Sequence, residues 1–448
     1  MTNGAGASLN RPWPTSTTVD NRGNLRFHNN SASELVTTYG SPLIIFDEDE
    51  FRTSTREIAD AFRGFTIYYA AKSFLSGRVC QLVNEAGLSI DVCTEGELRT
   101  VLGAEFSARN VLFHGNNKSA SEISFAMTHG VKRYASDTLE DLARLETAAH
   151  QTGVGDVNVL LRVIADVKSD THRHISTAHQ DQKFGFSVRD EQHGLGEAIR
   201  FVNRSDVLNL TGLHSHIGSQ ILNQDNFIQG AETAVKLYAD LRRSVAPTLC
   251  ELDLGGGFGI AYHDDEQDLD LVLLAQTLVS VVTDNCVSRG VPPPQLSVEP
   301  GRAISGRSCV TIYTVGSVKK AESGRTYVAV DGGMSDNVRT ALYDAKYTAR
   351  LANRAGDSQT VDSRVVGKHC DAGDIVVSNV LLPSDIKADD LLAVPATGAY
   401  CRSLSSTYNM LPRPPIVAIR NGDPVVTIRR ETYDDLTLLD CELRGTAL

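Results

Sequence analysis

The sequence predicts a (β/α)8 barrel of the TIM type followed by an all-β domain. Eight short β-rich runs recur over roughly 250 residues, which is the strand count and length of such a barrel. About 15–40 residues with helical, Ala-, Leu- and Glu-rich stretches follow each run, and long helical patterns become scarce after about Arg307. A doubly wound open sheet is the structural alternative.

Most of the eight runs end in a polar residue or a glycine or are followed directly by one, and most of them are apolar on both faces. Parallel strands that helices cover need two apolar faces, because neither face meets water. We expect the barrel to occupy residues 43–306. Its strands are expected, in chain order, at Thr66–Ala71, Leu88–Asp91, Val111–His114, Arg133–Ala135, Val157–Val163, Asn209–His216, Leu252–Leu254 and Gln295–Glu299.

Short strand-like runs separated by Gly, Asp, Asn and Pro dominate residues 307–448, which predicts a C-terminal β-sandwich or barrel-like domain. Residues 1–42 form an N-terminal tail and a segment that joins the β domain. Residues 1–30 are rich in Asn, Ser, Thr, Gly and Pro, and we expect them to be loosely held. The C-terminal runs are Cys309–Val318, Thr326–Val330, Asp374–Val377, Leu391–Pro395, Ile416–Arg420 and Pro424–Arg429.

Composition excludes several classes of protein. The net charge of −12 disfavours nucleic-acid binding, because a phosphate-binding surface needs a clustered basic excess. Hydrophobic residues make up 41% of the chain, which excludes disorder of the whole, and no run of about 18 apolar residues predicts a membrane span. Eight scattered cysteines without a CxxC pair, and a start without signal-peptide features, predict free thiols in a reducing cytoplasm.

Lys72 directly follows the first predicted strand, where barrel enzymes carry their catalytic side chains. A lysine at the dry mouth of a barrel is suited to imine formation with an aldehyde, because desolvation lowers its pKa and frees the amine. The alternative is a lysine that extends into solvent. The segment by itself does not decide between the two.

Three consecutive glycines, Gly255, Gly256 and Gly257, follow the seventh strand. Without Cβ atoms, their backbone N–H groups can close on a phosphate, and barrels often bind phosphate after strands seven and eight. A glycine triplet can also form a simple tight turn. The Lys-Ser/Thr pair of a P-loop does not follow here.

His214 and His216 lie two residues apart on the sixth strand and therefore face the same side. Two such histidines could bind zinc, but no third ligand has a clear spacing, and we expect no metal. Stacking of an imidazole on the flat ring of a cofactor is a better explanation of these histidines than a zinc site. Glu299 ends the eighth strand and can pair with a ring nitrogen. An aldehyde, a phosphate and a flat ring together describe pyridoxal 5′-phosphate.

With these motifs in order, the chain resembles the barrel-type, alanine-racemase-like pyridoxal-phosphate decarboxylases, and within them the diaminopimelate branch. The resemblance covers about residues 40–440. Its motifs are Tyr69–Lys72, His114–Lys118, Gln182–Gly185, His214–Gln220, Asp253–Gly259, Glu299–Arg302, Asp331–Asn337, Arg339 with Tyr343, His369–Cys370, Gly398–Tyr400 and Tyr408–Asn409.

The resemblance implies a role for each candidate cofactor-binding residue. Lys72 would form the imine with the cofactor, and Glu299 would keep the pyridine nitrogen protonated, so that the ring accepts the electrons left when CO2 departs. Asp91 would lie near the lysine and tune its charge. His216 would stack on the ring, and the phosphate would be held by Ser219, Gly255, Gly256, Gly257 and Tyr400.

The resemblance also implies a homodimer with shared active sites. In the family, the loop that carries Cys370 completes the active site of the other subunit, and its thiol would reprotonate the α-carbon. A small buried cysteine is the alternative reading for any of the other seven.

Substrate choice is where the chain departs from the family pattern. Arg302, Arg339 and Tyr343, with Tyr400, match positions that bind the substrate and its distal carboxylate. The family's next loop usually reads Cys-Glu-Ser-Gly-Asp, and its Glu receives the distal amine, whereas this chain has Asp371, which is shorter by roughly 1–1.5 Å. Arg173 stands where close relatives tend to carry an acid.

The expected reaction is decarboxylation of meso-2,6-diaminopimelate to L-lysine and CO2. One alternative is a related decarboxylase that acts on another carboxylated or diamino acid in secondary metabolism. A racemase is a further alternative, but Glu299 argues against it, because a racemase benefits from an arginine that leaves the pyridine nitrogen unprotonated. The last alternative is a regulatory protein that has lost catalysis. The presence of Lys72, Glu299 and Cys370 argues against this alternative.

Overall fold

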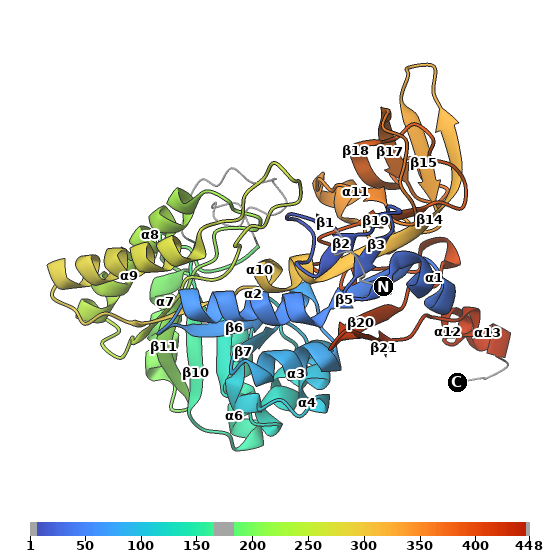
Figure 1. Cartoon of the computed structure of the whole chain (residues 1–448). Coiled ribbons are helices and arrows are strands. Elements are labelled where there is room, and N and C mark those ends of the chain that lie inside the picture. The colour runs from blue at the N-terminus through green and yellow to red at the C-terminus, as the bar shows by residue number, and fades with distance from the viewer. Residues whose placement is uncertain (1–6, 165–182, 445–448) are drawn as a thin grey trace. The chain divides into compact units, whose positions relative to one another are not determined.

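The computed structural model describes residues 7–164 and 183–444, which form two compact units. The barrel unit holds residues 55–164, 183–259 and 268–304, and the β unit holds residues 7–54, 260–267 and 305–444. Both appear in Figure 1, coloured along the chain. Residues 260–267 come from a loop between barrel elements, so the chain enters the β unit three times.

Eight parallel strands close the barrel unit into a cylinder, which confirms the predicted fold class. The strands pair in the order β10-β11-β12-β13-β6-β7-β8-β9, so the first strand of the barrel closes on the last. Their bounds are Thr66–Ala70 (β6), Ser89–Val92 (β7), Val111–Phe113 (β8), Arg133–Ser136 (β9), Val157–Arg162 (β10), Leu208–His214 (β11), Glu251–Asp253 (β12) and Gln295–Val298 (β13).

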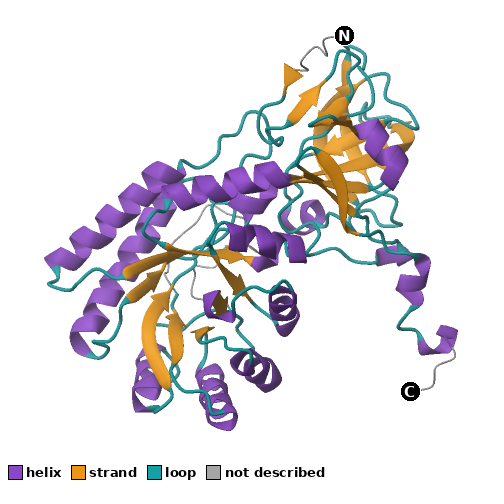
Figure 2. Cartoon of the chain, turned by 60° about the horizontal axis from the view of Figure 1, so that its bottom comes forward, coloured by secondary structure: helices purple, strands orange, loops and turns teal. Residues whose placement is uncertain are grey.

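Helices surround these strands, as Figure 2 shows. Side chains before the helices fix where several of them begin: Ser119 caps α5 and forms a reciprocal capping box with Glu122, and Thr138 caps α6. The helices of this unit are α3 (Gly77–Glu85), α4 (Glu95–Gly103), α5 (Ala120–Thr128), α6 (Leu139–Thr152), α7 (Leu195–Arg204), α8 (Gln224–Ser244) and α9 (Leu271–Ser288).

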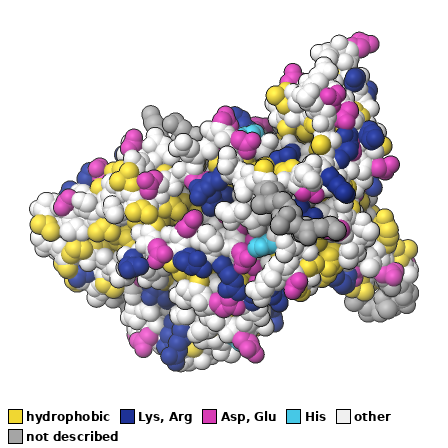
Figure 3. Space-filling model, viewed as in Figure 1, with side chains coloured by type: hydrophobic (Ala, Val, Ile, Leu, Met, Phe, Trp, Pro, Cys, Tyr) yellow, Lys and Arg dark blue, Asp and Glu magenta, His cyan; other side chains and the backbone are white. Residues whose placement is uncertain are grey.

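Helix α9 is the most apolar helix of the barrel unit. With 18 residues and a mean hydropathy of 1.5, it is long and apolar enough to cross a membrane by length and composition alone. Its buried residues include Leu274, Leu278, Val282 and Cys286, which recur every four positions and therefore form one face. This pattern is that of a helix covering a barrel. Hydrophobic side chains also gather on the exposed surface around α8 and α9 (Figure 3).

The β unit is built on a sheet in the order β18-β17-β15-β14-β5-β20-β21, with β16 and β19 attached to it. Strand β5 (Leu43–Asp47), whose residues we assigned to the barrel segment, lies here between β14 and β20, so the barrel unit begins later than predicted. The other strands are β14 (Cys309–Lys320), β15 (Thr326–Val330), β16 (Arg350–Leu351), β17 (Thr360–Val366), β18 (Ile375–Pro383), β19 (Leu391–Val394), β20 (Ile416–Arg420) and β21 (Asp423–Ile428).

The N-terminal segment is better ordered than its composition predicted. Four short antiparallel strands form a sheet of their own: β1 (Ala7–Ser8), β2 (Thr17–Val19), β3 (Leu25–Phe27) and β4 (Asn30–Ser31). Trp13, Leu25 and Phe27 are buried in one cluster with residues of β5, β14 and β20. The expectation of a loosely held tail is therefore wrong for these residues, because three large side chains anchor it.

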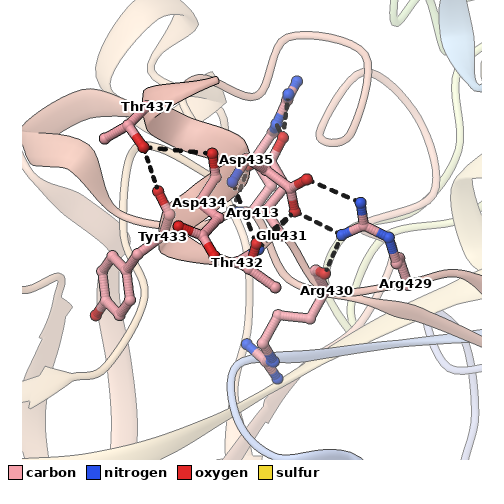
Figure 4. A network of polar contacts seen from close by, with 9 residues as sticks. All are labelled: Arg413, Arg429, Arg430, Glu431, Thr432, Tyr433, Asp434, Asp435 and Thr437. Carbon is pink, nitrogen blue, oxygen red and sulfur yellow. Dashed lines mark hydrogen bonds and ion pairs between the residues drawn. The ribbon is translucent and has the colours of Figure 1, made fainter. Parts of the chain in front are cut away.

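Ion pairs hold the last described segment, which continues from β21 into α12 (Tyr433–Thr437). Figure 4 shows its polar network. The Arg429 guanidinium donates to both carboxylate oxygens of Asp435, at 2.6 and 2.9 Å, and Arg413 donates to Glu431. Arg429 and the N-cap Thr432 lower the pKa of Asp435. The contacts of Asp435 fix the start of the helix, and the pair Arg413–Glu431 ties this segment to the chain before β20.

Candidate active site

Lys72 lies in a single 3-10 turn, η1 (Ala71–Ser73), immediately after β6. The Ala70 N–H donates to the Pro300 carbonyl at 3.1 Å, and the Tyr69 hydroxyl donates to the Phe74 carbonyl at 2.7 Å. The backbone that carries the lysine is thus bonded on both sides. The Lys72 side chain is exposed, which is the second of the two alternatives that the segment left open.

Asp91 lies within β7, beside Ala70 of β6, at the same end of the barrel. It is 1% exposed, and neither carboxylate oxygen has a hydrogen-bond partner among the residues that the structure describes. Burial and the Glu299 charge raise its pKa well above the usual range, whereas the charge of Lys72 acts to lower it. The charge of Lys72 thus acts on Asp91, and both carboxylate oxygens of Asp91 are buried without a hydrogen-bond donor among the described residues.

Glu299 follows β13 and lies between two histidines. Its Oε1 is 2.5 Å from Nε2 of His114, and its Oε2 is 3.4 Å from Nε2 of His214. The two imidazole rings meet edge to face with their centroids 4.8 Å apart. All three side chains are buried, and His114 and His214 come from the ends of β8 and β11.

The electrostatics of this group favour an ionised carboxylate. Burial lowers the pKa of His114 and takes that of His214 to about 4, whereas the charge of Glu299 acts to raise both. A neutral His114 still donates its Nε2 hydrogen to the carboxylate. Burial alone would raise the pKa of Glu299, but the two histidines reverse the effect and hold it well below its usual range. Glu299 is thus prepared to receive a protonated nitrogen.

Sequence reasoning assigned no role to His114, although it quoted the motif that contains it. The available signal was its position directly after the third strand, where side chains reach the barrel mouth. Lys118, in the same motif, is structural. Its ammonium group is fully buried and bonds to the carbonyls of Gly115 and Ala135, both at 2.7 Å, and to Asp141 at 2.8 Å.

By distance alone, His114, His214 and Glu299 could also hold a metal ion, since their ligand atoms lie within 4.8 Å of one another. The 2.5 Å contact with Glu299 uses the His114 nitrogen that would have to face such an ion. The arrangement suits a carboxylate oriented by two imidazoles better than a set of three metal ligands.

The glycine loop after β12 tolerates no side chain. A Cβ atom on Gly255 would lie 2.7 Å from Nδ1 of His216, and one on Gly256 would lie 2.1 Å from the Glu299 carbonyl. One on Gly257 would lie 2.3 Å from the Gly218 carbonyl, and Gly257 has a φ of +100°. The loop is therefore packed closely against the segments that follow β11 and β13.

Two of these glycine amides are already bonded within the protein. The Gly255 N–H donates to Asp253 at 2.8 Å, and the Gly256 N–H donates to Nδ1 of His216 at 3.1 Å. Among the three glycines, Gly257 is therefore the one whose N–H donates to no other group in the described chain. The bond from Gly256 also places the imidazole hydrogen of His216 on Nε2.

Ser219 and Arg302 lie together at this end of the barrel unit. Nη2 of Arg302 donates to the Ser219 hydroxyl at 2.9 Å, and the Arg302 side chain is buried. A guanidinium and a hydroxyl beside a glycine loop are donors suited to an anion such as a phosphate or carboxylate. The barrel unit thus brings together an exposed lysine, buried unpartnered carboxylate oxygens, an ionised glutamate and a donor-lined loop. These residues fit pyridoxal 5′-phosphate.

In the β unit, a network of hydrogen bonds holds the loop of Cys370. Asp374 accepts the N–H groups of Met334 at 2.7 Å and His369 at 2.8 Å. Oδ1 of Asn409 accepts the Cys370 N–H at 3.2 Å and lies 3.2 Å from Nδ1 of His369. The Cys370 thiol is exposed on this fixed loop.

Arg339 begins the short helix α11 (Arg339–Tyr343) and is 5% exposed. Its Nη1 donates to the hydroxyl of Tyr262 at 2.9 Å and to that of Tyr347, and no described carboxylate lies within 4.0 Å. Burial acts to lower its pKa, but the two tyrosines raise it overall. A buried guanidinium paired only with neutral hydroxyls suits a ligand carboxylate.

The remaining predicted residues are placed as follows. Tyr343 ends α11 and is half-buried, and Tyr400 is half-buried with a φ of +64°. Asp371 is exposed next to Cys370, and its Oδ1 accepts the Gly373 N–H at 2.8 Å. The predicted departure at Arg173 lies outside the described residues. Cys370, Asp371, Arg339, Tyr343 and Tyr400 thus belong to the β unit, and the other predicted site residues belong to the barrel unit.

The chain is similar to known proteins over nearly its whole length. Residues 48–306 match the family described as pyridoxal-dependent decarboxylase, pyridoxal binding domain. A diaminopimelate decarboxylase of Mycobacterium tuberculosis is 45% identical over 437 residues, which cover 96% of this chain and 97% of the relative.

Solved structures show the same likeness. The crystal structure of diaminopimelate decarboxylase from Helicobacter pylori, complexed with L-lysine, is 28% identical, with a TM-score of 0.82 over 92% of this chain and 100% of that one. The M. jannaschii diaminopimelate decarboxylase in co-complex with L-lysine is 25% identical, with a TM-score of 0.88 over 95% and 98%. The chain belongs to the diaminopimelate decarboxylase family of pyridoxal-dependent decarboxylases.

Proposed function

We propose that this protein converts meso-2,6-diaminopimelate to L-lysine and CO2 with pyridoxal 5′-phosphate as cofactor. The observation that carries the proposal is the likeness to diaminopimelate decarboxylases across both units, at 45% identity over 96% of the chain. Lys72, Glu299, Arg339 and Cys370 support it, because they offer the amine, the carboxylate, the guanidinium and the thiol that this reaction needs. We further propose a cytoplasmic location, in keeping with eight cysteines free of disulfide bonds.

The barrel unit would hold the cofactor. Nζ of Lys72 would bind its aldehyde carbon, Glu299 its ring nitrogen and His216 one ring face, while Asp91 would lie near the lysine and tune its charge. The phosphate would be bound by Ser219, the glycine loop and Tyr400. When bound, the cofactor supplies the electron sink that accepts the electron pair released with CO2.

The protein's own contribution to the reaction is charge placement and proton delivery. The attraction of His114 and His214 and their hydrogen bonds hold the pKa of Glu299 low despite its burial, so Glu299 would keep its charge and the ring nitrogen its proton. The exposed thiol of Cys370 would hold the proton that replaces the lost carboxylate on the α-carbon. Because Cys370 belongs to the β unit and Lys72 to the barrel unit, we propose a homodimer in which Cys370 serves the partner's site.

Charged side chains would recognise the distal end of the substrate. Arg302 and Arg339 would bind the distal carboxylate together with Tyr343 and Tyr400, and Asp371 would receive the distal ammonium group. Lysine lacks this carboxylate and would leave buried guanidinium groups without a counter-ion. That mismatch costs several kcal/mol, equivalent to roughly a thousandfold in specificity.

The test is CO2 release by purified protein from diaminopimelate, lysine and ornithine, each at equal concentration. We expect turnover of diaminopimelate and little or none of the other two. Efficient turnover of lysine would refute the carboxylate-binding arginines. Poor turnover of diaminopimelate that Asp371→Glu improves would indicate a different, longer substrate.

A further inference from the structure

In the proposed function, the distal ammonium group of the substrate would meet the loop of Asp371, whose carboxylate is already partly hydrogen-bonded. Its Oδ1 accepts the Gly373 N–H at 2.8 Å, its own N–H donates to the His369 carbonyl at 2.8 Å, and its carbonyl accepts the Asp374 N–H at 3.2 Å. One carboxylate oxygen is therefore turned toward its own loop. The other, Oδ2, accepts no hydrogen bond from the described residues of this loop.

A tyrosine from a distant segment lies beside that second oxygen. The hydroxyl of Tyr408 is 3.3 Å from Oδ2 of Asp371, which is 37 residues away in the sequence. The Tyr408 ring stacks on His369, with centroids 5.2 Å apart and planes inclined by 26°. His369 is itself fixed by Ser335 at 2.8 Å, so stacking holds the phenol in place.

Both side chains remain open to a ligand. Asp371 is exposed, and Tyr408 is 39% exposed. The charge of Asp371 raises the pKa of Tyr408, so the phenol stays protonated at neutral pH and can donate to the carboxylate. Its oxygen still carries lone pairs, and an ammonium group has three N–H donors to share.

We propose that Tyr408 is a specificity-determining residue whose hydroxyl, together with Oδ2 of Asp371, receives the distal ammonium group of the substrate. Asp371 is shorter by roughly 1–1.5 Å than the glutamate that the family usually carries, and the phenol extends the acceptor surface beyond it. The inference rests on the proposed function. It assigns to the Tyr408 hydroxyl the contact that the shorter side chain of Asp371 does not reach.

The first test is the kinetics of Tyr408→Phe on diaminopimelate. Phenylalanine keeps the ring on His369 and removes only the hydroxyl. We expect KM to rise about tenfold while kcat stays within about twofold, because the ammonium group loses one acceptor before and during the reaction alike. Tyr433→Phe is the matched control, since Tyr433 is 73% exposed in the same unit and should leave both constants unchanged.

The second test places Tyr408→Phe in an Asp371→Glu background. A glutamate reaches the ammonium group without help, so the loss of the hydroxyl should raise KM less than about threefold there. An equal effect in both backgrounds would contradict a shared role, and so would an unchanged KM in the Asp371 background.

A third measurement separates recognition from a displaced loop. The rate at which iodoacetamide alkylates Cys370, followed on its peptide by mass spectrometry, should be the same in wild type and Tyr408→Phe. A changed rate would show that the substitution moves the loop and would overturn a direct role. Wild type that releases no CO2 from diaminopimelate defeats the proposed function and this inference together, whereas an active wild type with an unaffected Tyr408→Phe defeats the inference alone.

Discussion

At the scale of single residues, Glu299 shows how two histidines keep a buried carboxylate ionised. Burial lowers the pKa of both imidazoles, yet their attraction to the carboxylate and the N–H that each can offer outweigh the burial of Glu299. The 2.5 Å contact from His114 carries most of this effect, because His214 lies farther away, at 3.4 Å. His114 is therefore a positioning residue that acts through Glu299.

Replacing His114 by alanine should weaken cofactor binding. A hydrogen bond to a charged group contributes about 1.5–3 kcal/mol, so the affinity of the apo-protein for pyridoxal phosphate should fall about 10- to 100-fold. Without the donor, burial raises the pKa of Glu299, and a protonated acid no longer pairs with a protonated ring nitrogen. Absorbance titration with the cofactor measures the affinity.

His114→Gln is the matched variant, because its amide also offers an N–H donor. It should recover most of the lost affinity. If alanine and glutamine behave alike, or if alanine binds the cofactor as wild type does, Glu299 does not depend on this contact.

At the scale of elements, two carboxylates organise the loops of the β unit. Asp336 accepts the Gly333 N–H at 2.9 Å and the Tyr313 hydroxyl, while Asp374 links Met334 to His369. Two loops that are distant in sequence are thereby joined at the base of the Cys370 segment. Burial raises the pKa of Asp336 to about 7, whereas hydrogen bonds from Tyr313 and Gly333 act to lower it.

This raised pKa predicts a pH-dependent stability. The folded protein keeps the Asp336 proton up to pH about 7, whereas the unfolded chain releases it near pH 4, so folding loses stability as the pH rises through this window. About three pKa units correspond to a loss on the order of 4 kcal/mol. Asp336→Asn mimics the protonated acid and removes this loss.

The measurement is thermal unfolding of wild type and Asp336→Asn at several values between pH 5 and pH 8. The difference in midpoint should move in favour of the asparagine variant as the pH rises. Parallel curves over that range would show that Asp336 has an ordinary pKa in the folded protein.

At the scale of the whole molecule, the predicted site residues divide between the two units. The lysine, the glutamate and the glycine loop belong to the barrel unit, and Cys370, Asp371 and Arg339 belong to the β unit. A site that needs both groups can be completed by a second subunit, as in our proposed homodimer.

Complementation tests this arrangement. Lys72→Ala and Cys370→Ala subunits should each be nearly inactive alone. Mixed dimers should recover activity, because one of their two sites combines an intact Lys72 with an intact Cys370. Subunit exchange is checked by native mass spectrometry on tagged chains. Exchange without recovered activity would place Lys72 and Cys370 in the same subunit's site.

Local patterns in the sequence were enough to predict the barrel. Each of its eight strands lies within two residues of the predicted run at both ends, since apolar runs and the helices between them are set by near neighbours. The positions of Lys72, His216 and Glu299 at strand ends follow directly from that register. Family motifs then supplied the cofactor and the reaction.

Tertiary structure decided what depends on distant partners. The run at Leu43–Asp47 is as apolar as a barrel strand, and only its pairing with β14 and β20 assigns it to the β unit. Strand β17 was not predicted from the sequence, because polar residues interrupt its run of apolar residues. The contacts of His114 with Glu299 and of Tyr408 with Asp371 span 185 and 37 residues, so no local spacing could reveal them. Side-chain contacts of that kind form only when the whole chain folds, because folding alone brings distant segments within hydrogen-bond reach.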